Sequence, residues 1–164
     1  MTRPHGAYAR VVVTAAVVLA SLLAQLAAQL GTADAAVARS AGGAYAQVAF
    51  DSTNAARQKA GLDELAPQRC LAKAATRQAK AMAAQERMFH QDIGKLLGAC
   101  GLSIVGENVA YGYPTGKSVV NDGWMKSAGH RANILNARFT LMGIAARKGH
   151  DDRWYVSQVF GGKG

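Results

Sequence analysis

The sequence predicts an α+β fold. Apolar residues at helical spacing come first along the chain, and two strand-like segments joined by a polar loop come last. Strands and helices do not alternate in the strand–helix–strand order, which argues against a doubly wound parallel sheet. The length of 164 residues is that of one domain.

The N-terminal segment has the pattern of a secretory signal peptide. Arg3 and Arg10 supply positive charge, residues 11–30 are almost entirely apolar, and Ala33-Asp34-Ala35 has the small-x-small form of a cleavage site. We predict cleavage after Ala35, so that residues 1–35 are removed and the mature protein is secreted and extracellular. The apolar stretch is also long enough to span a bilayer, so an uncleaved anchor is the alternative, and only this segment would then contact a membrane.

Residues 36–44 are mostly small and are predicted to form a flexible lead-in to a domain that spans 45–164. A first helix is predicted over 45–60, ended by Gly61. Four residues recur at i, i+3, i+4 and i+7 and share one face of it: Phe50, Thr53, Asn54 and Arg57. The last two are polar on a face that packs, and we expect them to hold loops by hydrogen bonds to backbone carbonyl groups.

Two further helical segments precede the first extended one. A helix from Pro67 to Glu86 is predicted from a stripe of apolar and small residues, namely Leu71, Ala75, Ala79 and Met82. A short helical piece follows at 93–97. The apolar stretch 104–112 is predicted to be extended and to direct the carboxylate of Glu107 inward.

The last third of the chain contains the remaining elements. A turn at 114–118 leads into a third helix, and the Ser-Ala-Gly sequence at 127–129 is predicted to break it just before His130. Two strands at 140–147 and 154–160 flank a polar hairpin loop and close the chain.

The chain is basic. Its formal net charge is +9, with 19 basic and 10 acidic residues. Removing Arg3, Arg10 and Asp34 with the signal peptide leaves 17 and 9, or +8. The first interpretation of this charge is general solubility, and as a binding feature it favours anionic partners such as cell-wall polymers, lipid headgroups or nucleic acid. The basic residues are scattered and lack interleaved aromatic residues, so no specific nucleic-acid binding is expected.

Cys70 and Cys100 are the two cysteines of the chain, and one intramolecular bridge between them is predicted. Export to an oxidising compartment favours this bridge over a catalytic or metal-binding role. Closing a loop of this size contributes about 3–4 kcal/mol in the chain-entropy model.

Several motifs occur in a fixed order. They are His90, then Gly106-Glu107-Asn108-Val109-Ala110, then Trp124 with Ser127-Ala128-Gly129-His130-Arg131-Ala132-Asn133-Ile134-Leu135, then Phe139 and Gly143, and finally Trp154-Tyr155-Val156 with Gln158-Val159-Phe160-Gly161. Together they resemble the CAP superfamily of cysteine-rich secretory proteins, antigen 5 and pathogenesis-related 1 proteins, in its bacterial SCP-domain form. The resemblance covers residues 50–161. It implies a three-layer α-β-α sandwich with a central antiparallel sheet.

The resemblance also implies a cleft lined by two histidines and two acidic residues. His90 and His130 match the histidines and Glu107 matches one acid, whereas the second acid falls near Ser127. This triad is a candidate site for a divalent metal such as zinc, or a metal-free acid–base pair. Ser127 has no nucleophile elbow and no clear third partner, so a nucleophilic role is not expected.

Three functions remain open from the sequence. The first is a secreted module that binds a lipid or sterol in an apolar groove, or an anionic cell-wall polymer on its basic surface. The second is a metal-dependent hydrolase, a protease or nuclease, in which His90, Glu107 and His130 hold zinc and act in catalysis. The third is a structural or interaction module without chemistry. A shared fold does not choose among them.

Overall fold

The structure is a computed structural model, and it describes residues 41–163. The predicted signal peptide, its cleavage after Ala35 and the start of the predicted lead-in lie outside the described residues. Within the described range, no helix combines the length and the apolar character needed to cross a membrane.

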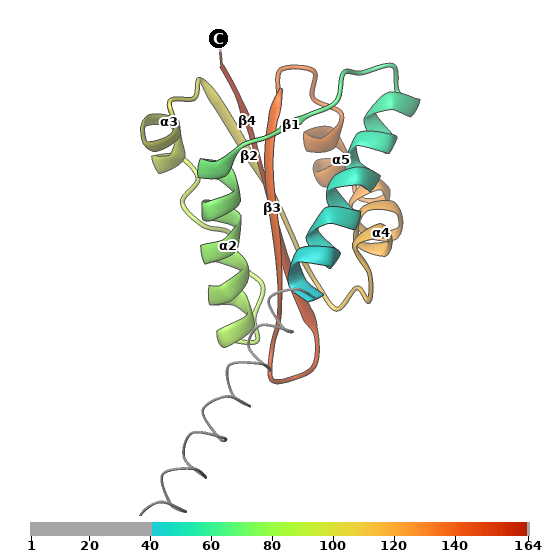
Figure 1. The fold of residues 1–164 in the computed structure, drawn as a ribbon, viewed down its shortest axis with the longest axis vertical. Helices are drawn as coiled ribbons and strands as arrows, with labels where there is room; N and C mark the ends of the chain where they lie inside the picture. The colour runs from blue at the N-terminus through green and yellow to red at the C-terminus, as the bar shows by residue number, and fades with distance from the viewer. Residues whose placement is uncertain (1–40, 164) are drawn as a thin grey trace, which may run out of the picture. The chain divides into compact units, whose positions relative to one another are not determined.

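The first helix covers residues 41–59 and is drawn in cyan in Figure 1. Residues 41–44, which the sequence assigned to a flexible lead-in, are therefore helical. This part of the helix packs closely on the sheet, because a Cβ atom on Gly42 would lie 2.7 Å from the carbonyl oxygen of Ala146. The chain leaves the helix through Gly61, whose φ of 72° is a left-handed conformation that glycine adopts without strain.

Polar side chains of this helix hold the loops, as predicted. Arg57 is 2% exposed, and its guanidinium donates hydrogen bonds to four backbone carbonyl groups, those of Asp63, Ile134, Asn136 and Phe139. Asn54 donates to the carbonyl oxygen of Leu65 at 3.1 Å and accepts from its amide at 3.0 Å. A buried cation is tolerated here because its donors are used.

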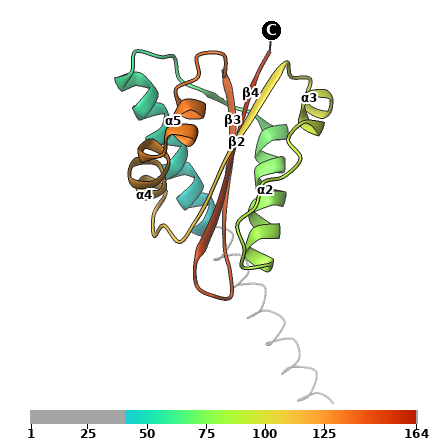
Figure 2. The ribbon, with the colours of Figure 1, turned by 180° about the vertical axis from the view of Figure 1, so that it is seen from behind.

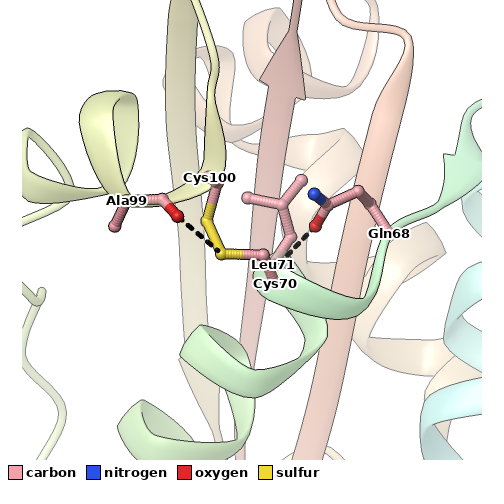
Figure 3. The surroundings of a disulfide bond; sticks show 5 residues. All are labelled: Gln68, Cys70, Leu71, Ala99 and Cys100. Carbon is pink, nitrogen blue, oxygen red and sulfur yellow. Dashed lines mark hydrogen bonds between the residues drawn. A yellow bond between two sulfur atoms is a disulfide. The ribbon is translucent and has the colours of Figure 1, made fainter.

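The second helix, α2, runs over Arg69–Ala84, and a two-residue strand, β1 (Ala66–Pro67), precedes it. The prediction that Pro67 opens the helix is wrong. Proline is accommodated in a strand at the edge of the sheet, where its missing N–H is not needed. Gln68 begins the helix instead, because its side-chain oxygen accepts a hydrogen bond from the amide of Leu71 at 2.7 Å (Figure 3).

The predicted disulfide joins α2 to the next helix, α3 (Lys95–Cys100). Cys70 lies in the first turn of α2 and Cys100 at the end of α3, with their Cα atoms 5.7 Å apart (Figure 3). The helix predicted at 93–97 lies further along the chain in the structure. Leu102 follows α3 and packs with Leu71 in the same core, so the bridge holds two packed segments together.

The sheet has four strands in the order β1-β3-β4-β2, where β2 is Ile104–Tyr111, β3 is Leu141–Lys148 and β4 is Trp154–Gly162. The hairpin of β3 and β4 confirms the two predicted final strands. β2 pairs with β4 antiparallel, placing Glu107 opposite Val159. The sheet is mixed and not wholly antiparallel as predicted, because β1 runs parallel to β3.

Helices cover both faces of the sheet, as predicted for three layers. Figures 1 and 2 show α2 and α3 on one face, and the first helix, α4 and α5 on the other. Successive residues of β4 feed the two cores: Val159 packs with α2, and Phe160 packs with the opposite layer. Gly143 of β3 lets the backbone of α2 approach closely, because a Cβ atom there would collide with Leu71 and Ala72.

The predicted third helix is a series of short pieces. They are α4 (Gly116–Ser118), a π-helical turn (Val119–Gly123), a 3₁₀ turn (Trp124–Lys126) and α5 (Ala128–Ile134). The break falls at Ser127 alone, whose backbone is extended. Gly129 lies inside α5, contrary to the prediction, so His130 belongs to the first turn of a new helix.

Candidate functional site

Glu107 lies at the centre of a buried hydrogen-bond network. Its side chain is 1% exposed. One carboxylate oxygen accepts from Nδ1 of His90 at 2.8 Å and from the Gln91 amide at 3.3 Å. The other accepts from Nε2 of Gln91 at 2.6 Å and from the hydroxyl of Ser157 at 3.0 Å. The predicted inward direction of this carboxylate is confirmed, and both of its oxygens are occupied.

His90 lies on the loop between α2 and α3, and its side chain is 60% exposed. Because the carboxylate of Glu107 can only accept, the proton of a neutral His90 ring belongs on Nδ1. The other nitrogen, Nε2, is then the basic one. The same loop is held to α2 by a hydrogen bond from Gln78 to the carbonyl oxygen of Phe89.

His130 is half-buried in the first turn of α5. Burial lowers the pKa of His130 below its ordinary value of 6.5, and the positive charge of nearby His90 lowers it further. The neutral imidazole is therefore favoured. His90 and His130 are close enough to interact electrostatically, but the hydrogen bonds of Glu107 include His90 and not His130.

The side chains of Asn108 and Asn133 hold the backbone of β2 to the backbone of α5. Asn108 donates to the carbonyl oxygen of His130 at 3.2 Å. Asn133 donates to the carbonyl oxygen of Glu107 at 3.2 Å and to the side-chain oxygen of Asn108 at 2.9 Å. Strand β2 and helix α5 are thus joined at the site by side chains, so that the relative position of Glu107 and His130 is set by the fold.

A cleft of about 600 Å³ lies beside this network. It is lined by residues from β2 and the loop after it, from the short helical turns, and from two loops: Met88, Val109, Ala110, Tyr111, Gly112, Tyr113, Gly123, Trp124, Ser127, His130 and Arg153. Most of these are apolar or aromatic. Of the predicted triad only His130 lines the cleft, since Glu107 is buried and His90 is outside the lining.

The polar groups of the cleft are few. Arg153 lies over the ring of Tyr111, with 5.9 Å between the guanidinium carbon and the ring centroid. Its Nε atom is 3.9 Å from the carboxylate of Asp151, which also accepts a hydrogen bond from the hydroxyl of Tyr155. No hydrogen bond joins the Ser127 hydroxyl to His130 within the described residues.

The three predicted residues do not fit a three-ligand zinc site. Each oxygen of Glu107 already accepts two hydrogen bonds. The carboxylate therefore accepts the hydrogen bond of His90 Nδ1 and orients that ring, and it is not directed toward a metal position. Across residues 41–163, no group of three or more His, Cys, Asp or Glu side chains is arranged to hold a metal ion. Zinc sites in proteins ordinarily use three or four protein ligands, and two imidazoles alone do not reach that number.

Sequence reasoning missed several residues that build the site. Gln91 directly follows His90. Its backbone and side-chain amides can both donate hydrogen bonds, which was an available signal that it could bind the carboxylate of Glu107 together with His90. Ser157 is two residues from Val159, the partner of Glu107, and diagonal neighbours on one face of a sheet are within reach of each other. The strand register needed to see this contact is not contained in either segment alone.

Comparisons with known proteins agree with the fold. The chain matches the model of the cysteine-rich secretory protein family, CAP, over residues 50–160. The uncharacterized protein YkwD of Bacillus subtilis is 38% identical over 109 residues, which are 62% of this chain and 42% of that protein. The uncharacterized membrane protein YlbC of the same organism is 42% identical over 55 residues, 34% of this chain and 14% of that protein. The chain therefore spans less than half the length of these curated relatives.

Solved structures share the architecture. An extracellular protein containing an SCP domain from Bacillus anthracis is 29% identical, with a TM-score of 0.64 over 74% of this chain and 41% of that one. An outer surface protein of Borrelia burgdorferi shares the fold at 20% identity, with a TM-score of 0.62 over 72% of this chain and 92% of that one. The ordered motifs, the three-layer architecture and the match over most of the chain give one conclusion: this chain belongs to the cysteine-rich secretory protein family, CAP.

Proposed function

We propose that this chain is an extracellular ligand-binding module whose cleft holds a small amphipathic molecule of the lipid or sterol class. One observation carries the proposal: a cleft of about 600 Å³ has apolar and aromatic walls with only a few polar groups at its edge. This composition and size are typical of small-molecule sites.

The walls and the polar groups suit the two parts of such a ligand. Met88, Tyr111 and Tyr113 are exposed or half-buried and offer apolar surface to a hydrocarbon body. Arg153 and the neutral imidazole of His130 offer a positive charge and a hydrogen-bonding group to its polar end. No acidic side chain is among the described residues that line the cleft, so a carboxylate or hydroxyl headgroup meets no like charge from them.

An extracellular location is supported by independent features. The N-terminal sequence has the pattern of an export signal. The disulfide between Cys70 and Cys100 is of a kind that persists in oxidising compartments. The Bacillus anthracis relative is an extracellular protein, and the Borrelia burgdorferi protein of the same fold is an outer surface protein.

A hydrolase is the second candidate, on the observation that Glu107 orients His90. The bond to Nδ1 makes Nε2 a basic nitrogen on an exposed ring, as general-base chemistry requires. The site lacks a third metal ligand and a paired nucleophile, and for this reason we rank hydrolysis second. Loss of a peptidase or nuclease activity in His90→Gln, with folding intact, would reverse this order.

The experiment measures binding of a fluorescent fatty acid and of a sterol to the exported, oxidised protein. Ser127→Phe fills the cleft, and Ser127 makes no side-chain capping bond that the change would remove. Ala55→Phe, at an exposed position on the first helix, is the matched control. We expect affinity for at least one of the two probes to fall about tenfold or more in Ser127→Phe and to be unchanged in the control.

Other outcomes would contradict the proposal. Equal affinity in all three proteins would place binding elsewhere on the molecule. Absence of binding to both probes would favour a structural or interaction module without a small ligand. Arg153→Gln adds a finer test, because it is expected to weaken a fatty acid more than the corresponding alcohol.

A further inference from the structure

The outward face of α2 carries an uninterrupted row of cations. Four residues at spacings of four, four and three fall on one side of the helix and are all exposed: Arg69, Lys73, Arg77 and Lys80. At a rise of about 1.5 Å per residue, the row extends about 16 Å along the helix axis. Figure 1 shows α2 as an outer element of its layer, with the sheet on its other side.

These four cations have no partners among the described residues. The ion pairs of residues 41–163 lie elsewhere and involve His90, Lys95, Lys126, Lys148 and Arg153. The helix sequence RCLAKAATRQAKAMAA contains no acidic residue, and its first turn has none. Among residues 41–163 the row is therefore a concentration of positive charge on one helix face without an ion-pair partner.

The arrangement works against the stability of the helix. Arg69 and Lys73, and then Lys73 and Arg77, are like charges at i, i+4, which repel each other. Arg69 also places a cation at the positive end of the helix dipole. Packing of the opposite face, through Leu71, Ala75 and Ala79, stabilises the helix independently of this row.

A shallow depression lies beside the row of cations. Ala72 and Thr76 are small, and with Arg69, Lys73 and Arg77 they line this depression of about 450 Å³. None of the described residues that line it is aromatic, so these residues offer no stacking surface for nucleic-acid bases. Nor is any of these five residues a large apolar one that could insert into a bilayer.

We propose that this α2 face, defined by Arg69, Lys73, Arg77 and Lys80, is a docking surface for a linear phosphate-bearing polymer without bases. A single row of charges about 5–6 Å apart, without large apolar side chains among the described residues beside it, suits an extended polyanion better than a flat membrane. Binding is electrostatic and is driven largely by release of counterions from the polymer. The surface is separate from the cleft, so this proposal and the lipid-binding proposal stand or fall independently.

The experiment measures binding of inorganic polyphosphate to the exported protein over a range of salt concentrations. The test variant replaces Arg69, Lys73, Arg77 and Lys80 with glutamine, which keeps a similar helix propensity. The matched control replaces four other exposed cations with glutamine and has the same net charge: Lys59, Lys117, Arg138 and Lys163. A parallel arm measures sedimentation with vesicles of phosphatidylcholine and phosphatidylglycerol.

We expect the test variant to lose at least about tenfold in affinity for polyphosphate and the control to stay close to the wild type. The slope of log K against log salt should fall by about 3 in the test variant, since each lost phosphate contact on a single-stranded polyanion removes about 0.7. Equal losses in the two variants would assign binding to net charge and overturn the proposal. Binding to vesicles but not to polyphosphate, sensitive to the α2 changes, would identify a membrane surface instead and would also overturn it.

Discussion

The buried site around Glu107 and the outer face of α2 handle charge in opposite ways. At the site, one carboxylate is almost fully buried and accepts four hydrogen bonds. On α2, four cations are exposed and have no partner among residues 41–163. The comparison teaches that Glu107, the charged residue that most resembles a catalytic group, has its carboxylate fully used in structural hydrogen bonds. The four exposed cations of α2, by contrast, are available to a ligand, although their helix face has no group typical of catalysis.

The largest expected effect on stability comes from substituting the buried carboxylate of Glu107. Glu107→Ala removes the acceptor of four hydrogen bonds and leaves the donors of Gln91 and Ser157 beside a cavity. We expect a loss of about 3 kcal/mol in the free energy of unfolding. Urea denaturation of the oxidised protein measures it.

Glu107→Gln is the matched control for that variant, because its amide oxygen still accepts and its size is the same. We expect it to lose less than half as much stability as Glu107→Ala. Equal stability of Glu107→Ala and the wild type would mean that the carboxylate is not committed to structure, and the contrast with α2 would disappear.

A smaller effect is expected from His130 as the pH changes. Its pKa is lowered in the folded protein by burial and by the charge of His90, from 6.5 in the unfolded chain. As the pH falls through 6.5, the unfolded state binds the proton first, so the stability falls until the pH is below the folded pKa. Tm should therefore drop from about pH 8 to about pH 5 less steeply in His130→Gln than in the wild type. Parallel curves for the two proteins would refute this assignment.

The smallest effect on stability is expected from the α2 face. Replacing its four cations with glutamine removes two repulsive i, i+4 pairs, each worth about 0.2–0.5 kcal/mol. The variant should thus be as stable as the wild type or up to about 1 kcal/mol more stable. Urea denaturation measures the change, and the control set of four cations should lie near zero. A marked loss of stability would show that these side chains have structural partners.

Much of the fold could be predicted because local patterns determine it. The final hairpin, the inward carboxylate of Glu107 and the bridge between Cys70 and Cys100 follow from alternation and composition, and the structure confirms them. The error at Pro67 occurs where tertiary packing decides, whereas Gly129 is exposed in α5 and a Cβ atom there would meet no close neighbour. Pro67 is held beside β3 as an edge strand, and Gly129 continues a helix that a sequence pattern would end.

The prediction grouped His90, Glu107 and His130 in one cleft, and the structure brings two of these three residues into hydrogen-bond contact. His90 and Glu107 are in contact, whereas His130 belongs to the cleft wall. The difference depends on Gln91 and Ser157, which fill the remaining positions around the carboxylate. The hydrogen bonds around the Glu107 carboxylate come from three segments that are far apart in the sequence. The residue spacing within any one segment therefore does not predict them.

The four carbonyl groups that hold Arg57 have a consequence for the order in which the chain acquires its structure. Three of them belong to residues 134, 136 and 139, far later in synthesis than Arg57 itself. Until the ribosome has released that segment, a first helix packed in its native place would enclose a guanidinium with most of its acceptors missing. The first helix therefore cannot pack in its native position before the later segments are made. The domain is expected to fold after its sheet has been synthesised, and not one helix at a time.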